Sequence, residues 1–141
     1  MSTICAEIAR SWIGTPYVDQ ASIKGVGTDC LGLVRGVWRE RYGQEPEPVP
    51  HYTNDWGEVG GQEPLFDAAL RHMTLCPTEL AGEGDVLLFR MREGSVAKHL
   101  GVLVGPFPTP RFVHAYSGHG VVESPLTLSW RRRVAAVFRF P

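Results

Sequence analysis

The most informative part of this 141-residue sequence is Thr28-Asp-Cys-Leu-Gly-Leu-Val-Arg-Gly-Val-Trp38. Its apolar side chains recur at helical spacing, at Leu31, Val34 and Trp38. This spacing predicts an amphipathic helix that begins near Asp29 or Cys30 and buries one face. Because the turn-rich residues 14–28 come before it, Cys30 is expected in the first turn of the helix, directly after a loop.

The position of Cys30 has two interpretations. The dipole and the free N–H groups of a helix N-terminus stabilise a thiolate and lower the pKa of a cysteine there. The same N–H groups could donate hydrogen bonds to an oxyanion that develops during attack on an amide carbonyl. Alternatively, Cys30 is a small buried apolar side chain, as free cysteines often are. Position alone leaves both open.

A nucleophilic cysteine needs a base, usually a histidine oriented by a third group. Of the five histidines, His51 lies in a Pro-rich loop, His72 on a predicted short helix and His119 in a Ser-Gly-His-Gly turn. These three are interpreted as solvated or supporting residues. His99 and His114 differ, because each lies in an apolar run that predicts a strand.

The two strand histidines are more informative together than separately. The turn-rich Gly105-Pro-Phe-Pro-Thr-Pro110 joins their strands and predicts a hairpin. In registers centred on that turn, the imidazoles of His99 and His114 can lie on one face, opposite or diagonal to each other. One would take the thiol proton and the other would orient the first ring. A lone strand histidine is more often a satisfied core or edge residue, so the sequence allows this arrangement without requiring it.

The rest of the chain predicts helices in its N-terminal half and strands in its C-terminal half. Further helices are predicted over residues 3–12 and 65–73, and strands over residues 85–90, 99–104, 111–116, 120–124 and 134–140. Helices first and strands afterwards predict an α+β fold, with N-terminal helices on a mostly antiparallel sheet of five to six strands. The length of 141 residues fits a single domain over residues 1–141.

Composition narrows the class of protein. The 14 Lys and Arg nearly balance the 15 Asp and Glu, which gives a net charge of −1 and argues against nucleic-acid binding. The 16 Gly and 11 Pro indicate many turns. No apolar run is long enough for a membrane span, and the first residues lack the features of a signal peptide. We therefore expect synthesis in the cytoplasm and another delivery route for any role outside it.

Cofactors and metals are not expected. The sequence has no Gly-rich phosphate loop, Cys-x-x-Cys pair or His-Glu-x-x-His motif. A zinc site made of Cys30, His99 and His114 is therefore disfavoured. The odd number of three cysteines excludes a complete disulfide framework, and Cys5 and Cys76 are interpreted as structural.

Two other features carry weaker expectations. Arg131-Arg132-Arg133 is interpreted as a solvated strand edge. Tyr52 and Trp56, in the long segment between the second and third helices, would either line a cleft or pack that segment down.

The sequence resembles the NlpC family of bacterial cell-wall peptidases, which are compact papain-like cysteine peptidases. The blocks that carry the resemblance are, in chain order, Gly14-Thr-Pro-Tyr17, Thr28-Asp-Cys-Leu-Gly-Leu-Val34, Gly84-Asp-Val-Leu-Leu-Phe89, His99-Leu-Gly-Val-Leu-Val-Gly105 and Phe112-Val-His-Ala115. They span most of the chain. The Asp-Cys-x-Gly-Leu and His-x-Gly blocks are specific when they occur together.

The resemblance implies a role for each matching residue. Cys30 matches the nucleophile, His99 the general base and His114 the polar residue that orients the base. Tyr17 matches a tyrosine whose hydroxyl helps the N–H of Cys30 to form the oxyanion hole. Asp29 matches the acidic residue beside the cysteine, with a role at the helix start or in substrate contact.

One departure concerns the residue after the nucleophile. Many family members have serine there, where this chain has Leu31, so substrate contacts at that position are expected to differ.

The function that the resemblance implies is cleavage of peptidoglycan stem peptides, typically at the bond between D-glutamate and diaminopimelate or lysine. Residues 29–38 also resemble a stand-alone branch found with phage-tail and gene-transfer-agent proteins. Tail or baseplate proteins are then the expected partners, and a particle would carry the enzyme to the periplasm or cell wall. Two alternatives are a catalytically silent tail-tip or baseplate module and a cysteine amidase or acyltransferase that acts on another substrate.

Overall fold

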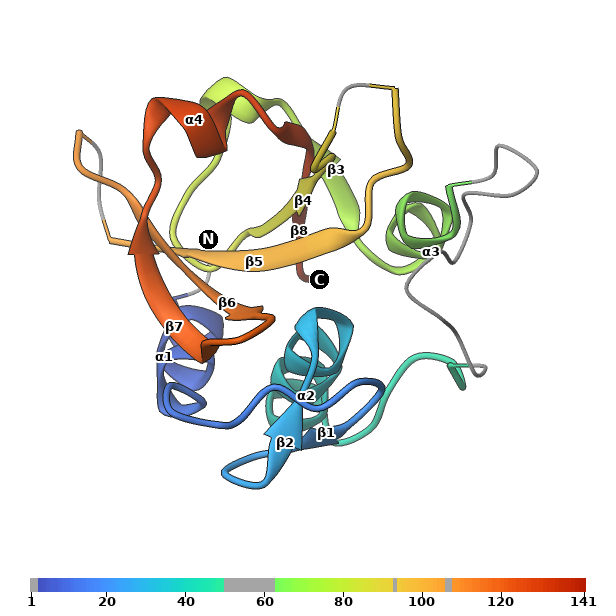
Figure 1. Cartoon of the computed structure of the whole chain (residues 1–141). Helices are drawn as coiled ribbons and strands as arrows, with labels where there is room; N and C mark the ends of the chain where they lie inside the picture. The colour runs from blue at the N-terminus through green and yellow to red at the C-terminus, as the bar shows by residue number, and fades with distance from the viewer. Residues whose placement is uncertain (1–2, 50–62, 93, 106–107) are drawn as a thin grey trace.

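The computed structural model describes residues 3–49, 63–92, 94–105 and 108–141. Its helices are α1 (Thr3–Ser11), α2 (Cys30–Tyr42), α3 (Pro64–His72) and α4 (Leu128–Arg131), with a short 3-10 helix η1 (Thr78–Leu80). Its strands are β1 (Ser22–Ile23), β2 (Gly27–Thr28), β3 (Thr74–Cys76), β4 (Val86–Phe89), β5 (His99–Val104), β6 (Arg111–Tyr116), β7 (Gly120–Pro125) and β8 (Val134–Arg139). The predicted α+β class is confirmed (Figure 1).

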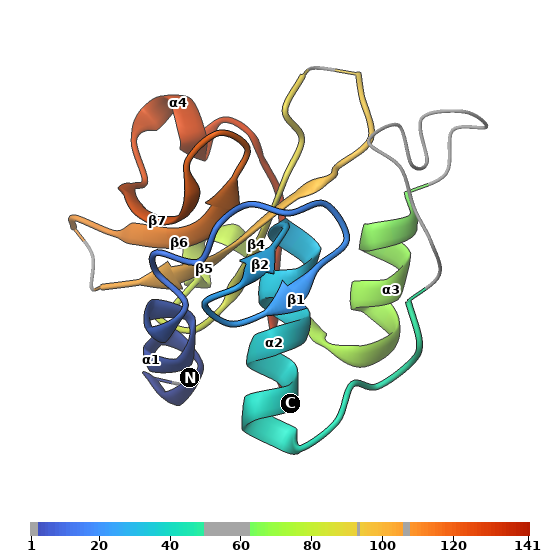
Figure 2. The same cartoon turned by 60° about the horizontal axis from the view of Figure 1, so that its bottom comes forward.

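Six strands form one antiparallel sheet in the order β3-β8-β4-β5-β6-β7, and β1 and β2 form a separate ribbon. The five predicted strands are β4 to β8, and β3 adds a sixth at one edge. Helices α1 and α2 lie on one side of the sheet and α4 on the other (Figure 1). Turned by 60°, the molecule shows α3 standing beside α2 (Figure 2).

The central strands β4 and β5 are buried along their whole length, which explains why their sequences are nearly continuous apolar runs. In β4, Val86 and Leu88 pack in the cluster that includes α1 and α2, while Leu87 and Phe89 pack in a second cluster on the opposite face. This alternation follows from the two-residue repeat of a strand.

The two strand histidines lie on the face of the second cluster. Leu103 of β5 and Phe112 of β6 belong to that cluster, and strand residues an even number apart share a face. The pairing of β5 with β6 matches Leu103 with Phe112, so the predicted hairpin is confirmed. A Cβ at Gly101 would lie 3.4 Å from Cβ of His114, which sets His114 opposite Gly101 and diagonal to His99.

A tight contact fixes α1 against α2. A Cβ on Gly36 would lie 2.1 Å from the Trp12 ring, so only glycine fits at this crossing. Trp12 is 2% exposed, and its Nε1 donates to Oε2 of Glu40 over 2.6 Å. The contact holds the helix that carries Cys30 at its first residue.

Some elements differ from the sequence-based expectation. The β1–β2 ribbon, β3, η1 and α4 are too short to show hydrophobic periodicity, so the sequence pattern does not predict them. The interpretation of Arg131-Arg132-Arg133 as a strand edge is wrong, because Arg131 ends α4 and the next two residues form a turn before β8. His51, Tyr52 and Trp56 lie outside the described residues. No helix among the described residues is long and apolar enough to cross a membrane.

Candidate active site

Asp29 shapes the start of α2. As its N-cap, Asp29 accepts a hydrogen bond at Oδ1 from the N–H of Gly32 over 2.7 Å. Its Oδ2 accepts from the N–H of Gln20 over 2.7 Å, where the backbone has a positive φ of 63°. The 2%-exposed carboxylate therefore ties the preceding loop to the helix. The helix-start role is what the geometry shows, while a substrate contact by Asp29 stays a prediction.

Cys30 is the first residue of α2 and is half-buried. Its Sγ–H donates to the carbonyl of Lys98 over 3.4 Å, and the N–H of Leu100 also acts on the sulfur. The thiol of α2 thus lies against the backbone on both sides of His99, the first residue of β5. The structure brings the predicted nucleophile and the predicted base together.

The lowered thiol pKa that a helix N-terminus favours is not found at Cys30. Burial, followed by the negative charge of Asp29, raises the pKa of Cys30 to about 12. The backbone N–H groups of Leu100, Leu31 and Cys30 lower the pKa of the thiol, but their effect is smaller than that of burial and Asp29. The thiol is therefore protonated at neutral pH, because desolvation of the charged form dominates over the helix start.

His99 and His114 make a direct contact. Nε2 of His99 lies 2.8 Å from Nδ1 of His114, and Nε2 of His114 lies 2.9 Å from Oγ of Ser124 on β7. Nδ1 is therefore the ring nitrogen of His99 that is left for the thiol. The three side chains come from adjacent strands and form one hydrogen-bonded series that leads away from Cys30.

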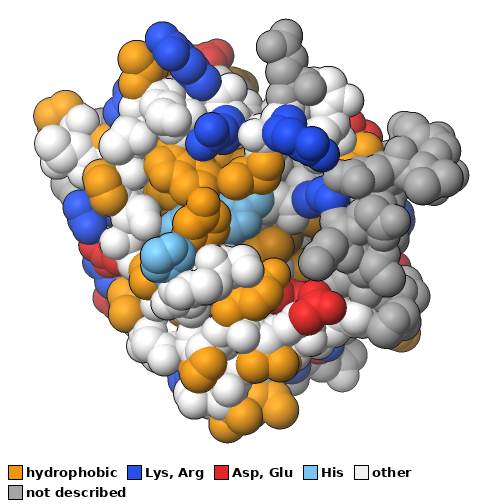
Figure 3. Space-filling view, viewed as in Figure 1, with side chains coloured by type: hydrophobic (Ala, Val, Ile, Leu, Met, Phe, Trp, Pro, Cys, Tyr) orange, Lys and Arg blue, Asp and Glu red, His pale blue; other side chains and the backbone are white. Residues whose placement is uncertain are grey.

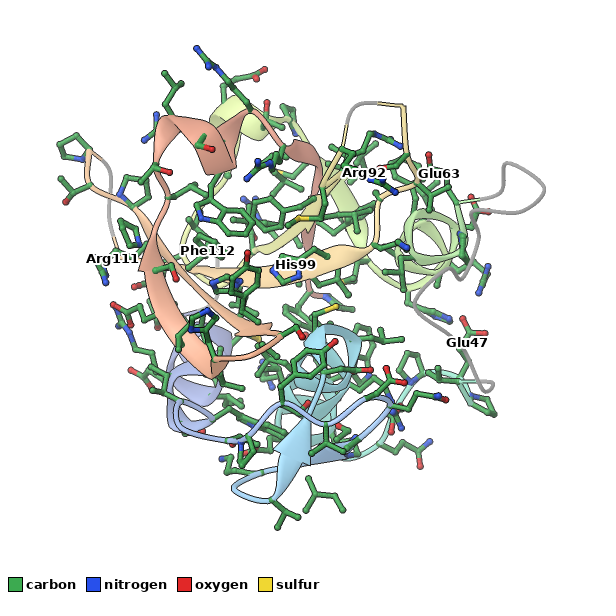
Figure 4. All side chains as sticks on the ribbon, in the orientation of Figure 1. Glu47, Glu63, Arg92, His99, Arg111 and Phe112 are labelled. Atoms are coloured by element: carbon green, nitrogen blue, oxygen red, sulfur yellow. The ribbon has the colours of Figure 1, made fainter. Side chains whose placement is uncertain are left out.

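Aromatic side chains surround the two imidazoles. The ring centroid of Trp130, on α4, lies 5.7 Å from that of His99 and 5.3 Å from that of His114. The Phe112 ring packs against the His114 ring in a tilted arrangement, with centroids 4.2 Å apart, and Phe112 lies near His99 in Figure 4. Burial, followed by the charge of its partner His114, lowers the pKa of His99 to about 3. Burial, followed by the charge of His119, lowers the pKa of His114 to about 4, so both rings are neutral at physiological pH.

Tyr17 stands beside the thiol. Its backbone forms a parallel bridge with Thr28, two residues before Cys30, which fixes the loop next to the start of α2. Burial, followed by the charges of Cys30 and Asp29, raises the pKa of the Tyr17 phenol to about 12. The phenol therefore keeps its proton and can donate a hydrogen bond toward the site.

Glu63, at the N-cap of α3, holds the segment that leads to His99. Its Oε1 accepts from the N–H of Ala97 over 2.9 Å, and its Oε2 accepts from Arg90 over 2.8 Å. Arg90 also donates to the carbonyl of Ser95. Figure 4 shows Glu63 on the α3 side of this segment. These bonds fix the backbone beside the thiol through side chains from two other elements.

A cavity of about 420 Å³ opens beside the site, between α2, α3 and residues 45–49. Leu31 and Leu100, the chain neighbours of Cys30 and His99, lie in its wall. Arg71 and His72 of α3 both contact Oε1 of Glu47 at 2.7 Å at its edge. Leu31 therefore gives this wall an apolar side chain. On the face in Figure 3, histidine surface lies among hydrophobic side chains, below several Lys and Arg side chains.

The predicted site residues gather in one place: Tyr17, Asp29, Cys30, His99 and His114. His72 pairs with Glu47, and the exposed His119 stacks on Tyr116 at 5.3 Å. The sequence did not point to Ser124 or Trp130, since neither belongs to a motif. Ser124 reaches the site through the register of β7, and Trp130 through the four-residue helix α4. Among the described residues, no group of three or more His, Cys, Asp or Glu side chains is arranged to hold a metal ion.

Comparison with known proteins gives a consistent result. Residues 14–139 match the model of the NlpC/P60 family. The murein DD-endopeptidase MepS/murein LD-carboxypeptidase of Escherichia coli is 32% identical over 123 residues, which are 86% of this chain and 54% of that protein. The match therefore covers only about half of the length of that relative.

Two solved structures have the same fold. The NlpC/p60 domain of the peptidoglycan hydrolase SagA is 20% identical, with a TM-score of 0.65 and coverage of 99% of this chain and 100% of that chain. An NlpC/P60 family protein of Bacillus cereus is 18% identical, with a TM-score of 0.68 and coverage of 99% of this chain and 40% of that chain.

Proposed function

The chain belongs to the NlpC/P60 family, and on this premise we propose that it is a cysteine peptidase that cleaves the stem peptides of peptidoglycan. The observation that carries the proposal is the contact of the Cys30 thiol with the backbone on both sides of His99. His99 is in turn held by His114 over 2.8 Å. A nucleophile, a base and an orienting group are the parts that acyl transfer by a thiol needs.

The mechanism begins from an uncharged thiol and an uncharged imidazole. When a peptide carbonyl reaches Sγ of Cys30, Nδ1 of His99 takes the thiol proton as the sulfur–carbon bond forms. The N–H of Cys30 and the hydroxyl of Tyr17 donate hydrogen bonds to the oxyanion. Protonated His99 then gives its proton to the leaving amine as the carbon–nitrogen bond breaks. Water, deprotonated by His99, hydrolyses the thioester and restores the thiol.

We propose the D-glutamyl–diaminopimelate bond as the bond that is cut. The support is the resemblance of the Asp-Cys-x-Gly-Leu and His-x-Gly blocks at Cys30 and His99 to those of the family. The Escherichia coli relative is named for DD-endopeptidase and LD-carboxypeptidase activities, so the products of all three cleavages have to be distinguished.

Digestion of purified sacculi tests this function. The purified protein should release muropeptides with a new amino terminus on diaminopimelate, as identified by mass spectrometry, and iodoacetamide should abolish the release. Cys30→Ala should be inactive, whereas Cys76→Ala, which removes a thiol on the strand at the far edge of the sheet, should remain active. Unchanged release by Cys30→Ala would overturn the assignment.

The same experiment separates the alternatives. A structural tail module predicts no release by the wild-type protein, together with particles that need the protein but assemble normally with Cys30→Ala. A cysteine amidase or acyltransferase predicts thiol-dependent products with a different bond broken or a group transferred, which the product masses would reveal.

We also propose that a phage or gene-transfer-agent tail delivers the protein to the periplasm or cell wall. The support is the resemblance of residues 29–38 to the stand-alone, tail-associated branch. Immunoblots of purified particles from the source culture should detect the protein with tail proteins, and its absence from particles would refute the delivery route.

A further inference from the structure

We propose that Ser124 is a positioning residue that, through His114, selects the tautomer in which His99 can accept the thiol proton. The inference rests on the proposed function for its catalytic consequence, while the tautomer itself is a property of the folded chain. It adds to the mechanism a residue that contacts neither the thiol nor the substrate.

The geometry comes from three adjacent strands. The series runs from Nε2 of His99 to Nδ1 of His114 over 2.8 Å, and from Nε2 of His114 to Oγ of Ser124 over 2.9 Å. The pairing of β6 with β7 matches Phe112 with Ser124 and His114 with Val122. Ser124 is therefore the diagonal neighbour of His114 on the same face, within reach of its ring.

A neutral imidazole carries one proton, so each ring donates at one nitrogen and accepts at the other. If Oγ of Ser124 accepts from Nε2–H of His114, then Nδ1 of His114 accepts from Nε2–H of His99. Nδ1 of His99 is then a free lone pair, as the base needs. If Oγ instead donates to His114, every bond in the series reverses, and Nδ1 of His99 carries a proton that blocks it.

The surroundings make the Ser124 acceptor necessary. His114 is 1% exposed, and its ring is covered by Phe112 at 4.2 Å and Trp130 at 5.3 Å. A buried N–H without an acceptor is unfavourable. Ser124 is only partly buried, so its own hydroxyl proton can point to solvent while Oγ accepts. Without this hydroxyl, His114 is expected to move its proton to Nδ1, where His99 becomes the acceptor.

Two substitutions of similar shape isolate the hydroxyl. Ser124→Thr keeps an Oγ on the strand, and Ser124→Val has nearly the same shape as threonine without any hydrogen-bonding atom. Both side chains suit a strand, so a difference between the two variants reports the hydrogen bond.

The direct measurement is long-range proton–nitrogen NMR of the full chain with nitrogen-15-labelled histidine near pH 7. Wild type and Ser124→Thr should show Nε2 protonated and Nδ1 unprotonated in both His99 and His114. Ser124→Val should show Nδ1 protonated in both. A wild-type spectrum with Nδ1 of His99 protonated overturns the proposal, and so does a Ser124→Val spectrum identical to wild type.

The second measurement is turnover of a soluble muropeptide. Ser124→Val should lower kcat by about tenfold or more with little change in KM, because only the population of competent base falls. Ser124→Thr should restore kcat to near the wild-type value. If the wild-type protein releases no peptide while the NMR pattern holds, the proposed function fails and the tautomer assignment stands.

Discussion

At the scale of single residues, the Cys30 thiol and the His99 imidazole are both uncharged at neutral pH. Burial holds the pKa of Cys30 up at about 12 and that of His99 down at about 3. In the proposed mechanism, the thiolate would therefore form only as a substrate carbonyl arrives, and the proton transfer would belong to the attacking step. Since thiolate is the form that oxidants attack, a protonated thiol is also protected between turnovers.

This charge state predicts how Cys30 reacts with iodoacetamide. Well below a pKa of about 12 the thiolate fraction rises about tenfold per pH unit. The alkylation rate, followed by mass spectrometry, should rise through pH 6–9 without a plateau.

Cys30→Ala is the control, because the remaining thiols of Cys5 and Cys76 are only 0% and 8% exposed and should stay unmodified in the native protein. A plateau below pH 8 would instead indicate a thiolate–imidazolium pair in the free enzyme.

The motif blocks of the sequence named Tyr17, Asp29, His99 and His114 as candidates for a site around Cys30, although the residues alone did not require these side chains to meet. The sequence did not predict their protonation, since the burial that sets it arises from packing by distant residues such as Trp130 and Phe112. Ser124 escaped prediction for a similar reason, because its contact with His114 depends on the register between β6 and β7.

At the scale of elements, the start of α2 is fitted to the loop before it. A Cβ on Gly32 would lie 2.0 Å from the carbonyl oxygen of Ala21 and 2.6 Å from Oγ1 of Thr28. Oγ of Ser22 also donates to the carbonyl of Gly32 over 2.6 Å. The glycine of the Asp-Cys-x-Gly-Leu block thus allows the Tyr17-bearing loop to lie against the helix that carries Cys30.

Two glycine variants of α2 should therefore behave differently. Gly32→Ala forces the loop backbone away and should lower the free energy of unfolding by about 1–3 kcal/mol, with a large fall in kcat. Gly36→Ala meets the Trp12 ring at 2.1 Å and should destabilise the fold by a similar amount.

Gly36 lies six residues after Cys30, the first residue of α2, whereas Gly32 lies two residues after it, so the kcat of Gly36→Ala should fall much less than that of Gly32→Ala. Urea denaturation and muropeptide turnover measure the two effects. Equal loss of kcat in both variants at matched stability would contradict a specific role of Gly32 in holding the loop.

Elements with long apolar runs could be predicted from sequence, and β5 and β6 have the predicted bounds. The elements that the sequence did not predict are stabilised by contacts with other parts of the chain. For example, β3 has three residues and pairs with β8 at the sheet edge, and α4 has four residues with Thr127 as its cap. Such short elements have no periodicity of their own, so tertiary contacts decide their conformation.

At the scale of the whole molecule, burial of two neutral histidines links stability to pH. The pKa values of His99 and His114 fall from 6.5 in the unfolded chain to about 3 and about 4. Between these values the unfolded state binds more protons than the folded state, so the free energy of unfolding decreases as pH is lowered. Four carboxylates have a lowered pKa, and their contribution to the free energy of unfolding is lost only below about pH 4.5. They are Glu45, Glu47, Glu63 and Glu123.

Between pH 6.5 and 4.5, the change in the free energy of unfolding therefore reflects mainly the two buried histidines, His99 and His114. The urea midpoint of the wild-type protein should fall steadily across this window and change little between pH 7 and 8. His114→Asn, which removes one of the two groups, should show a shallower fall. A wild-type midpoint that stays constant from pH 7 to 4.5 would show that the rings are accessible to protons in the folded state.

The overall class was predictable because it follows from the order of helices and strands along the chain. The order of strands in the sheet was not, since nothing local in residues 134–139 indicates that β8 lies between β3 and β4. That arrangement is set by which apolar faces cover one another, a property of the complete packing.

The central place of β8 also bears on how quickly the chain reaches its native state. Val137 of β8 pairs with both Cys76 and Leu87, so the middle of the sheet closes only after long segments of chain have come together. Pairing between strands so distant in sequence gives a high contact order, and such topologies fold in milliseconds to seconds. Because β5 pairs with β4, the strand that carries His99 belongs to the sheet that β8 closes.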